Sequence, residues 1–432
     1  MFLASKAGAK LGDENYMEHD GGLSFLKNEN VNMRQIVRAL LAVSAIAAAM
    51  CISWLVATVK FAESMIKCSF VIWAIFYTCG AVVGLSSPAL KTSSGLPALS
   101  IICLVLLLFL GCTYCAIRKR IAFASANLKT ACAALRAHVM LMPVACLGLL
   151  LSFGWCLAWS LAVVSVTTQG LVSWKVSTAF LAFLSFYWGQ EVCSNINHVT
   201  ISGTVSSWWC HPEGDQETLA VSNSLRRALT TSFGSICFGS LLVAICEVLH
   251  ALLNECSKQS KGPLKVLACC LRCLIGCMEN VVRYFNRFAF VYIGLEGCSF
   301  CSAASKVSGL FSRLGFFGTV LNDVVISRVL TMGILGVSVM SSATGFGIGY
   351  GIFNDTDAAS ACCALGFAVG YAMASATMMV VSSAVATVYV AFGKSSESLQ
   401  AYHPAAYVDL KRGWQTMYPA VTARFIDTSP SV

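Results

Sequence analysis

Long apolar runs follow one another along most of the chain and are separated by short polar stretches. A helix needs about 20 apolar residues to cross the roughly 30 Å hydrocarbon core of a bilayer. Runs of this length occupy 39–59, 68–87, 95–117, 137–167, 228–252, 324–350 and 358–392. Segments 171–209 and 264–297 mix apolar and polar positions, and we expect helices that face the bundle interior or the interface. The pattern predicts an all-α fold, a polytopic transmembrane helical bundle of about nine spans.

Two of these runs, 137–167 and 358–392, are longer than one upright span requires. Such a helix can tilt, extend beyond the bilayer or contain a break, and Pro143 lies near the start of the first run.

Basic residues indicate the orientation of the spans. Residues 118–120 read Arg-Lys-Arg and close the third span, and Lys129 and Arg136 follow. Because cytosolic loops are enriched in Lys and Arg, we expect 118–136 and the tail after Phe392 to be cytosolic. Three spans precede this basic loop, which places the N-terminus outside unless a further N-terminal span is missing from the sequence.

Polarity also divides the chain into three parts. Residues 1–35 are polar with balanced charge and are expected to form an N-terminal tail. Residues 36–393 hold all the predicted spans and form the transmembrane domain. Residues 394–432 are expected to be a C-terminal cytosolic tail.

Composition supports a membrane protein: 57% of the 432 residues are hydrophobic and 11% are charged. A soluble domain carries about 25% charged residues, so an ordinary soluble enzyme or a disordered chain is excluded. The net charge of +9 fits basic cytosolic loops and does not indicate a nucleic-acid partner. Most of the 22 cysteines lie in apolar runs, where Cys packs as a small apolar residue, so packing is favoured over a disulfide framework.

A polar stripe crosses segment 171–209. In a helix, Trp188, Glu191, Asn195 and His198 are spaced 3, 4 and 3 residues apart and share one face, flanked by Tyr187. A carboxylate, an amide and a histidine on a membrane helix are costly unless they face protein or water. The stripe therefore indicates a substrate or proton pathway, with a purely structural hydrogen-bond network between helices as the alternative.

An aromatic pair, Trp155 and Trp159, lies four residues apart on the preceding predicted helix. Together with Tyr187 and Trp188 it can form a cage whose ring faces bind a quaternary ammonium. The alternative is that these tryptophans face lipid or the membrane interface, which is common.

Several further charges fall within predicted spans. Glu279 and Arg283 are four residues apart and are expected to pair. Snorkelling to the interface accounts for most of the arginines. Glu247 and Glu296 are less easily explained this way and are candidate functional groups.

Four cysteines, Cys269, Cys270, Cys273 and Cys277, cluster at helical spacing. Because no second cysteine pair stands out to complete a zinc site, we interpret them as packing thiols or acylation sites, with no metal. The sequence also lacks a Walker A motif, a dinucleotide fingerprint, GxSxG and HExxH, so no cofactor and no enzymatic activity are predicted.

Four blocks of residues resemble the choline transporter-like family. They are 118–122 with Lys129; Glu191, Val192, Asn195, 198–200, Gly203, Trp208 and Trp209; 227–242; and the cysteine cluster through Tyr284, Asn286, Arg287, Ala289 and Gly297 to 299–303 and Leu310. They occur in order over about 118–325. The chain departs from the family pattern at Ser194, where lysine is common, and at Glu296, where tyrosine is common; three spans rather than four precede the basic loop.

The resemblance implies an all-helical transporter of about ten spans, so that the bundle has about 9–10 spans in all. It also implies secondary or facilitative transport of choline or a related amine such as ethanolamine. The predicted substrate-binding residues are Trp155, Trp159, Tyr187, Trp188, Glu191, Asn195, His198 and Glu296. Expected partners are the organic cation and membrane lipids, and a homo-oligomer is allowed; the plasma membrane is favoured over an organelle membrane. The alternatives are a non-transporting membrane scaffold or lipid-interacting protein and, less favoured, a membrane enzyme acting on a head group.

Overall fold

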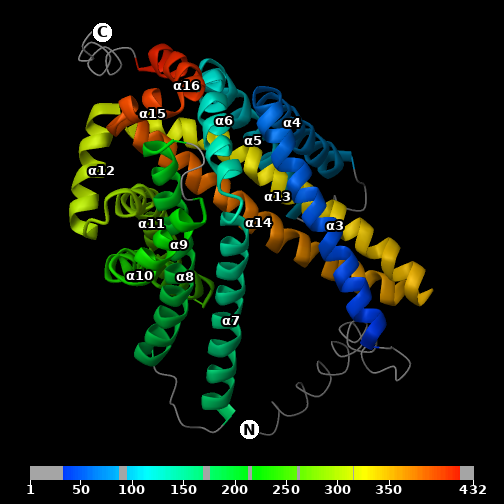
Figure 1. Ribbon diagram of the computed structural model, residues 1–432. Helices are drawn as coiled ribbons and strands as arrows, with labels where there is room; N and C mark the ends of the chain where they lie inside the picture. The colour runs from blue at the N-terminus through cyan, green and yellow to red at the C-terminus, as the bar shows by residue number, and fades with distance from the viewer. Residues whose placement is uncertain are drawn as a thin grey trace, which may run out of the picture. The chain divides into compact units, whose positions relative to one another are not determined.

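The computed structural model describes residues 33–86, 95–168, 176–212, 217–259, 263–314 and 316–418. Within these ranges the chain forms the α-helices α3 to α16 and one short 3-10 helix, Arg118–Arg120, without any strand (Figure 1). The predicted all-α fold is confirmed. Of the tail expected over 1–35, residues 1–32 lie outside the described ranges and residues 33–35 belong to helix α3; residues 419–432 also lie outside these ranges.

Nine long helices cover the predicted spans. They are α3 (Met33–Lys60), α4 (Ala62–Ser86), α5 (Gly95–Ile117), α7 (Leu141–Thr168), α8 (Val176–Cys210), α10 (Phe233–Gln259), α11 (Pro263–Glu296), α13 (Phe316–Phe353) and α14 (Thr356–Lys394). Within the described residues, six of them hold stretches long and apolar enough to cross a membrane: Arg38–Thr58, Glu63–Val82, Leu141–Thr168, Phe233–Lys258, Asp323–Phe353 and Thr356–Lys394. Helix α5 contributes a shorter apolar stretch, Ser100–Cys115, and α8 and α11 carry more polar residues.

Pro143 does not break a span. A turn at 138–140 separates α6 (Ile121–Ala137) from α7, and Pro143 lies in the first turn of α7. Proline is tolerated there because the amides of a first turn have no partner within the helix. Segment 137–167 is therefore one helix that begins after the turn, and α14 runs unbroken over 39 residues.

Helices also form where the sequence analysis expected a loop and a tail. Residues 121–137 fold as α6, most of which is buried, and α9 (Glu217–Leu229) and α12 (Phe300–Leu314) follow later. The segment after Phe392 forms α15 (Ser396–Tyr402) and α16 (Pro404–Met417), with Trp414 buried against Phe392 and Phe123. These segments are amphipathic, and packing of their apolar side chains against neighbouring helices stabilises them.

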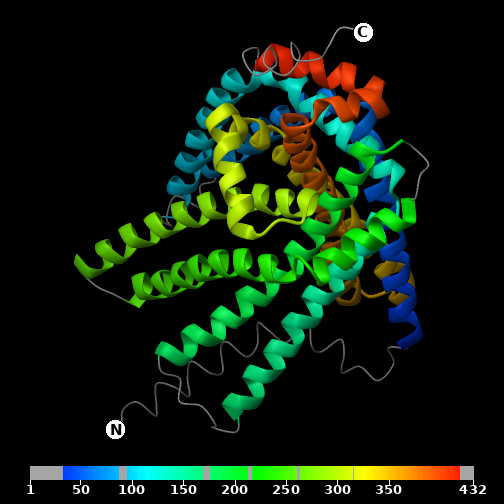
Figure 2. The same ribbon diagram turned by 60° about the vertical axis from the view of Figure 1, so that its left-hand side comes forward.

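The chain divides into two compact units. One holds residues up to Thr58 together with Leu330–Met378, and the other holds Val59–Val329 and Met379–Val432. In the first unit α13 and α14 approach closely through glycines: a Cβ on Gly345 would meet the carbonyl oxygen of Cys362 at 2.4 Å. In the second unit α8, α10 and α11 pack against one another, and α10 and α11 run side by side (Figure 2).

Gly294 brings α11 into backbone contact with α8. A Cβ on Gly294 would lie 2.8 Å from Ser202 Cβ and 2.9 Å from the carbonyl oxygen of Val199. Only a residue without a side chain fits there. This contact sets the separation of the two helices that carry the polar stripe and its partners.

We expect Gly294→Ala to lower the free energy of unfolding by about 1–3 kcal/mol, because the added methyl group forces α8 and α11 apart. Thermal unfolding in detergent measures the change. The matched control is Gly154→Ala on α7, where a Cβ meets nothing within 4 Å. Equal free energies of unfolding in the two variants would contradict the close contact between α8 and α11.

Candidate functional site

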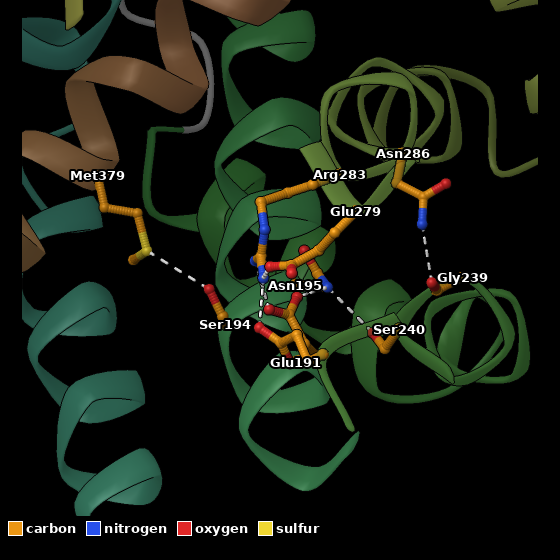
Figure 3. A network of polar contacts seen from close by, with 10 residues as sticks. Glu191, Ser194, Asn195, Gly239, Ser240, Glu279, Arg283, Asn286 and Met379 are labelled. Atoms are coloured by element: carbon orange, nitrogen blue, oxygen red, sulfur yellow. Dashed lines mark hydrogen bonds and ion pairs between the residues drawn. The ribbon is translucent and has the colours of Figure 1, made fainter. Parts of the chain in front are cut away.

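An arginine surrounded by carboxylates lies where α8, α10 and α11 meet. Arg283 of α11 donates from Nη1 to Glu191 Oε1 of α8 at 2.6 Å and from Nη2 to Glu247 Oε1 of α10. Its Nη2 also contacts Glu279 Oε1, one turn earlier on α11, at 3.4 Å. Figure 3 shows the guanidinium beside Glu191 and Glu279. The predicted Glu279–Arg283 pair is confirmed, whereas the convergence of Glu191 and Glu247 on the same arginine was not predicted.

The network has an excess of negative charge. Three carboxylates against one guanidinium leave a formal charge of −2 when all are ionised. The carboxylate side chains are 15–17% exposed, whereas Arg283 is 43% exposed. Partial burial strengthens the electrostatic interaction of these carboxylates with any cation that approaches them.

Further polar side chains hold the carboxylates in place. Asn195 Nδ2 donates to Glu191 Oε2 at 3.2 Å and to Ser240 Oγ of α10 at 3.0 Å. His250 Nδ1 lies 3.0 Å from Glu279 Oε2. Of the polar stripe on α8, Glu191 and Asn195 therefore belong to one network, which continues onto α10 and α11 (Figure 3).

The aromatic pair of α7 packs against α8. Trp155 Nε1 donates to the carbonyl of Phe186 at 3.1 Å, and Trp159 Nε1 contacts the carbonyl of Ala182 and the hydroxyl of Ser185, each at 3.2 Å. A Cβ on Gly189 would overlap the Trp155 ring, so this glycine creates the space for the indole. The pair thus ties α7 to α8.

The other two aromatic residues of the predicted cage lie differently. Trp188 Nε1 donates to the carbonyl of Cys237 on α10 at 3.0 Å. Tyr187 contacts the ring of Phe186, with 5.4 Å between centroids. The indole N–H groups of Trp155 and Trp159 thus bond to α8 and that of Trp188 bonds to α10, while the cage formed by their ring faces stays a prediction.

His198 belongs to a second, buried network. Its Nε2 donates to the carbonyl of Arg287 on α11 at 2.9 Å, and Nδ1 pairs with the hydroxyl of Ser383 on α14 at 2.6 Å. The residue is 7% exposed. His198 therefore joins three helices and lies away from Glu191, with which it shares only a helix face.

Arg287 is the charged centre of this second network. Its Nη1 contacts both oxygens of Asp323 on α13, at 2.6 and 2.7 Å, and its Nη2 donates to the carbonyl and hydroxyl oxygens of Ser382. The sequence analysis assigned such arginines to interfacial snorkelling and did not consider Asp323. The sequence did offer a signal for this pair. Asp323 directly precedes the apolar run 324–350, and a carboxylate next to a membrane span is expected to have a charged or hydrogen-bonding partner.

Glu296 lies at the C-terminal end of α11, apart from both networks. Its carboxylate pairs with Lys306 of α12 and, at 2.7 Å, with Lys394 of α14. The hydrogen bond to Glu296 raises the pKa of Lys306. This contact links three helix ends, so Glu296 is not brought together with the other predicted site residues.

The cysteine cluster is exposed along α11. Cys269, Cys270, Cys273 and Cys277 are all free thiols. Among the described residues no group of three or more His, Cys, Asp or Glu side chains is arranged to hold a metal ion. Packing and acylation both remain interpretations of this cluster.

The whole of this site lies within a region that matches a known protein family. The model of the family described as plasma-membrane choline transporter matches residues 101–397, well over half of the chain. The chain belongs to this choline transporter family. The resemblance carried by the four sequence blocks is confirmed, and all four lie inside the matched region. Proteins of this family are transporters and not enzymes, as the sequence analysis predicted.

Curated relatives support the same assignment. A CTL-like protein of Dictyostelium discoideum is 29% identical over 404 residues, which cover 91% of this chain and 68% of the relative. A PNS1 protein of Gibberella zeae is 31% identical over 251 residues, covering 56% and 46%, and a second Dictyostelium CTL-like protein is 32% identical over 192 residues, covering 42% and 35%. The chain spans about two thirds of the first relative and less than half of the other two. Its membership of this family and its long apolar helices together establish that the protein is an integral multi-pass membrane protein.

Proposed function

We propose that the protein transports choline or a related amine such as ethanolamine across a membrane, as a facilitator or secondary transporter. The observation that carries the proposal is the negative charge of the Glu191, Glu247 and Glu279 carboxylates around Arg283. It lies within the region that matches the choline transporter family. Intramembrane carboxylates that are paired and partly buried are typical of substrate or ion pathways.

Each group in the network has a role in this proposal. Glu191 and Glu247 balance the charge of the bound cation, and Asn195 orients Glu191 through its hydrogen bond. Access alternates between the two sides of the membrane as helices of the bundle rearrange around the site. The apolar surroundings of the site include four aromatic side chains on α7 and α8, those of Trp155, Trp159, Tyr187 and Trp188. In this proposal His198 and Glu296 hold helices together.

We propose the plasma membrane as the location, because the description of the matched family names that membrane. An organelle membrane is the alternative. Lipids surround the apolar spans, and the proposed partner in function is the organic cation itself.

Purified protein in liposomes should show saturable uptake of labelled choline or ethanolamine that excess unlabelled amine abolishes. Empty liposomes and liposomes with heat-unfolded protein provide the background. The alternative function, a scaffold or lipid-interacting protein, predicts no uptake from folded protein inserted in both orientations. Localisation of the tagged chain in cells, with a plasma-membrane and an organelle marker, tests the location separately.

A further inference from the structure

A polar pocket opens where α6, the end of α8 and the two C-terminal helices meet. Helix α6 packs against α16, and α15 and α16 join at His403 (Figure 1). The pocket has a volume of about 500 Å³, within the usual range for small-molecule sites. All of its lining residues belong to the second compact unit, and none of them belongs to the network around Arg283. Its C-terminal wall, 402–409, also lies beyond the region that matches the family.

The N-terminus of α16 forms one side of this pocket. Its first three residues, Pro404, Ala405 and Ala406, line the pocket, and no side chain caps this helix end. The N–H of Tyr407 bonds to the carbonyl of His403, so the N–H groups of Ala405 and Ala406 have no acceptor within the helix. Free amides and the positive end of the helix dipole together favour an anion.

A buried indole in the wall of the pocket is a second donor without an acceptor. Trp208 of α8 is 4% exposed, and its ring stacks on His403 with 3.9 Å between centroids. Its Nε1 has no hydrogen-bond partner in the part of the chain that the structure describes. Because an indole N–H only donates, the group that would satisfy it is an acceptor. This observation is independent of the helix end and agrees with it.

Two unpaired charges of opposite sign complete the lining. Lys129 of α6 and Asp409 of α16 are exposed, and neither forms a salt bridge with another described residue. An adjoining pocket of about 240 Å³ shares both residues and adds Arg412 and Glu63, the latter already paired with Lys67 at 2.8 Å. Lys129 strengthens the attraction for an anion, whereas Asp409 repels a simple anion and attracts an ammonium group. The lining therefore fits a ligand that carries both charges.

We propose that this pocket binds a phosphate ester of an amino alcohol, a zwitterion. Its phosphate bonds to the free amides of α16 and to Lys129, and its ammonium group faces Asp409. Phosphate is a common ligand of helix N-termini and of lysine. A free phosphoamine and a phospholipid head group share this chemistry. The site is separate from the proposed transport site and adds a second ligand to the protein.

Binding of labelled phosphoethanolamine to the purified protein, in a detergent without phosphate, tests the proposal. We expect saturable binding that excess unlabelled phosphoethanolamine abolishes. Inorganic phosphate and ethanolamine each carry one half of the zwitterion and should compete at least about tenfold more weakly. Absence of saturable binding would overturn the proposal. Phosphate that competes as well as phosphoethanolamine would also overturn it, because the pocket would then recognise an anion alone.

A short-chain phosphatidylethanolamine distinguishes the two sources of the ligand. Competition as strong as that of phosphoethanolamine would identify a lipid head group as the ligand. Competition at least about tenfold weaker would identify the free phosphate monoester. Either result supports the shared chemistry.

Three variants assign the binding to this pocket. Lys129→Gln should weaken phosphoethanolamine binding about tenfold, and Asp409→Asn should make phosphate and phosphoethanolamine compete about equally. Both side chains are exposed, so neither change disturbs packing. Lys411→Gln is the matched control on α16, outside both pockets, and should keep the wild-type affinity. Wild-type behaviour of both Lys129→Gln and Asp409→Asn would overturn the proposal, and uptake of ethanolamine tests the transport function separately.

Discussion

Arg287→Ala is expected to lower the free energy of unfolding by about 3–5 kcal/mol, the cost of leaving a buried charge without its partner. Asp323 loses both of its contacts to Nη1 of Arg287, at 2.6 and 2.7 Å, and the two side chains are only 20% and 21% exposed. Ser382 loses its donor as well. Chemical or thermal unfolding of the purified protein in detergent measures the loss.

Two further variants show whether the ion pair is the cause. Replacing both Arg287 and Asp323 by alanine should restore part of the stability, because no charge then remains unpaired. Arg272→Ala, on the same helix, should cost much less, since Arg272 bonds the neutral amide of Asn254. A single Arg287 variant no less stable than the Arg272 variant would contradict the assigned contact.

Glu191→Gln should reduce saturable amine uptake about tenfold or more, which is the largest effect on transport that we expect. The substitution keeps the size of the side chain and an oxygen that accepts the hydrogen bond from Asn195 Nδ2, but it removes one of the negative charges around Arg283. A charged contact of this kind is worth about 1.5–3 kcal/mol, and 1.4 kcal/mol corresponds to a factor of ten. Initial uptake rates over a range of amine concentrations, per folded protein, give the effect.

The matched control for this variant is Glu296→Gln. It makes the same chemical change in a carboxylate that pairs with Lys306 and Lys394 away from the network. We expect near wild-type uptake from it. Equal losses in the two variants would show that any buried carboxylate matters, and that the network has no special role.

Much of the fold could be predicted because apolar run length is a strong signal. Every predicted span coincides with a long helix in the described residues, including α8 and α11, whose polar positions weaken the signal. The helices α6, α15 and α16 were missed because the prediction followed apolar runs of about 20 residues, whereas these helices have only 17, 7 and 14 residues. They are stabilised by tertiary packing, such as Trp414 on Phe123, which sequence periodicity does not reveal.

The candidate site could be predicted only in part. Spacing within one helix identified Glu191 with Asn195 and paired Glu279 with Arg283. It could not show that Glu247 of α10 meets the same arginine, since that depends on how α8, α10 and α11 pack. His198 lies on the same face of α8 as Glu191 but two turns further along the helix. At that point α8 has other neighbours, and His198 bonds to α11 and α14.

The aromatic residues illustrate the same limit. Trp155 and Trp188 were grouped with Trp159 and Tyr187 because four aromatic rings on neighbouring helices can form a cage for a quaternary ammonium. The structure directs their indole N–H groups to the carbonyls of Phe186 and Cys237, on different helices. These contacts, which a count of ring positions cannot reveal, fix where each indole is anchored and leave the ring faces free for a cation.

The central claim is that the carboxylates around Arg283 bind the organic cation, and equilibrium binding of labelled ethanolamine to purified protein tests it most directly. Uptake reports binding together with translocation, whereas binding in detergent isolates the site. We predict saturable binding to the wild-type protein and a dissociation constant about tenfold higher in Glu191→Gln, at equal amounts of folded protein. Equal affinity in the two proteins would contradict the claim and place the cation elsewhere in the molecule.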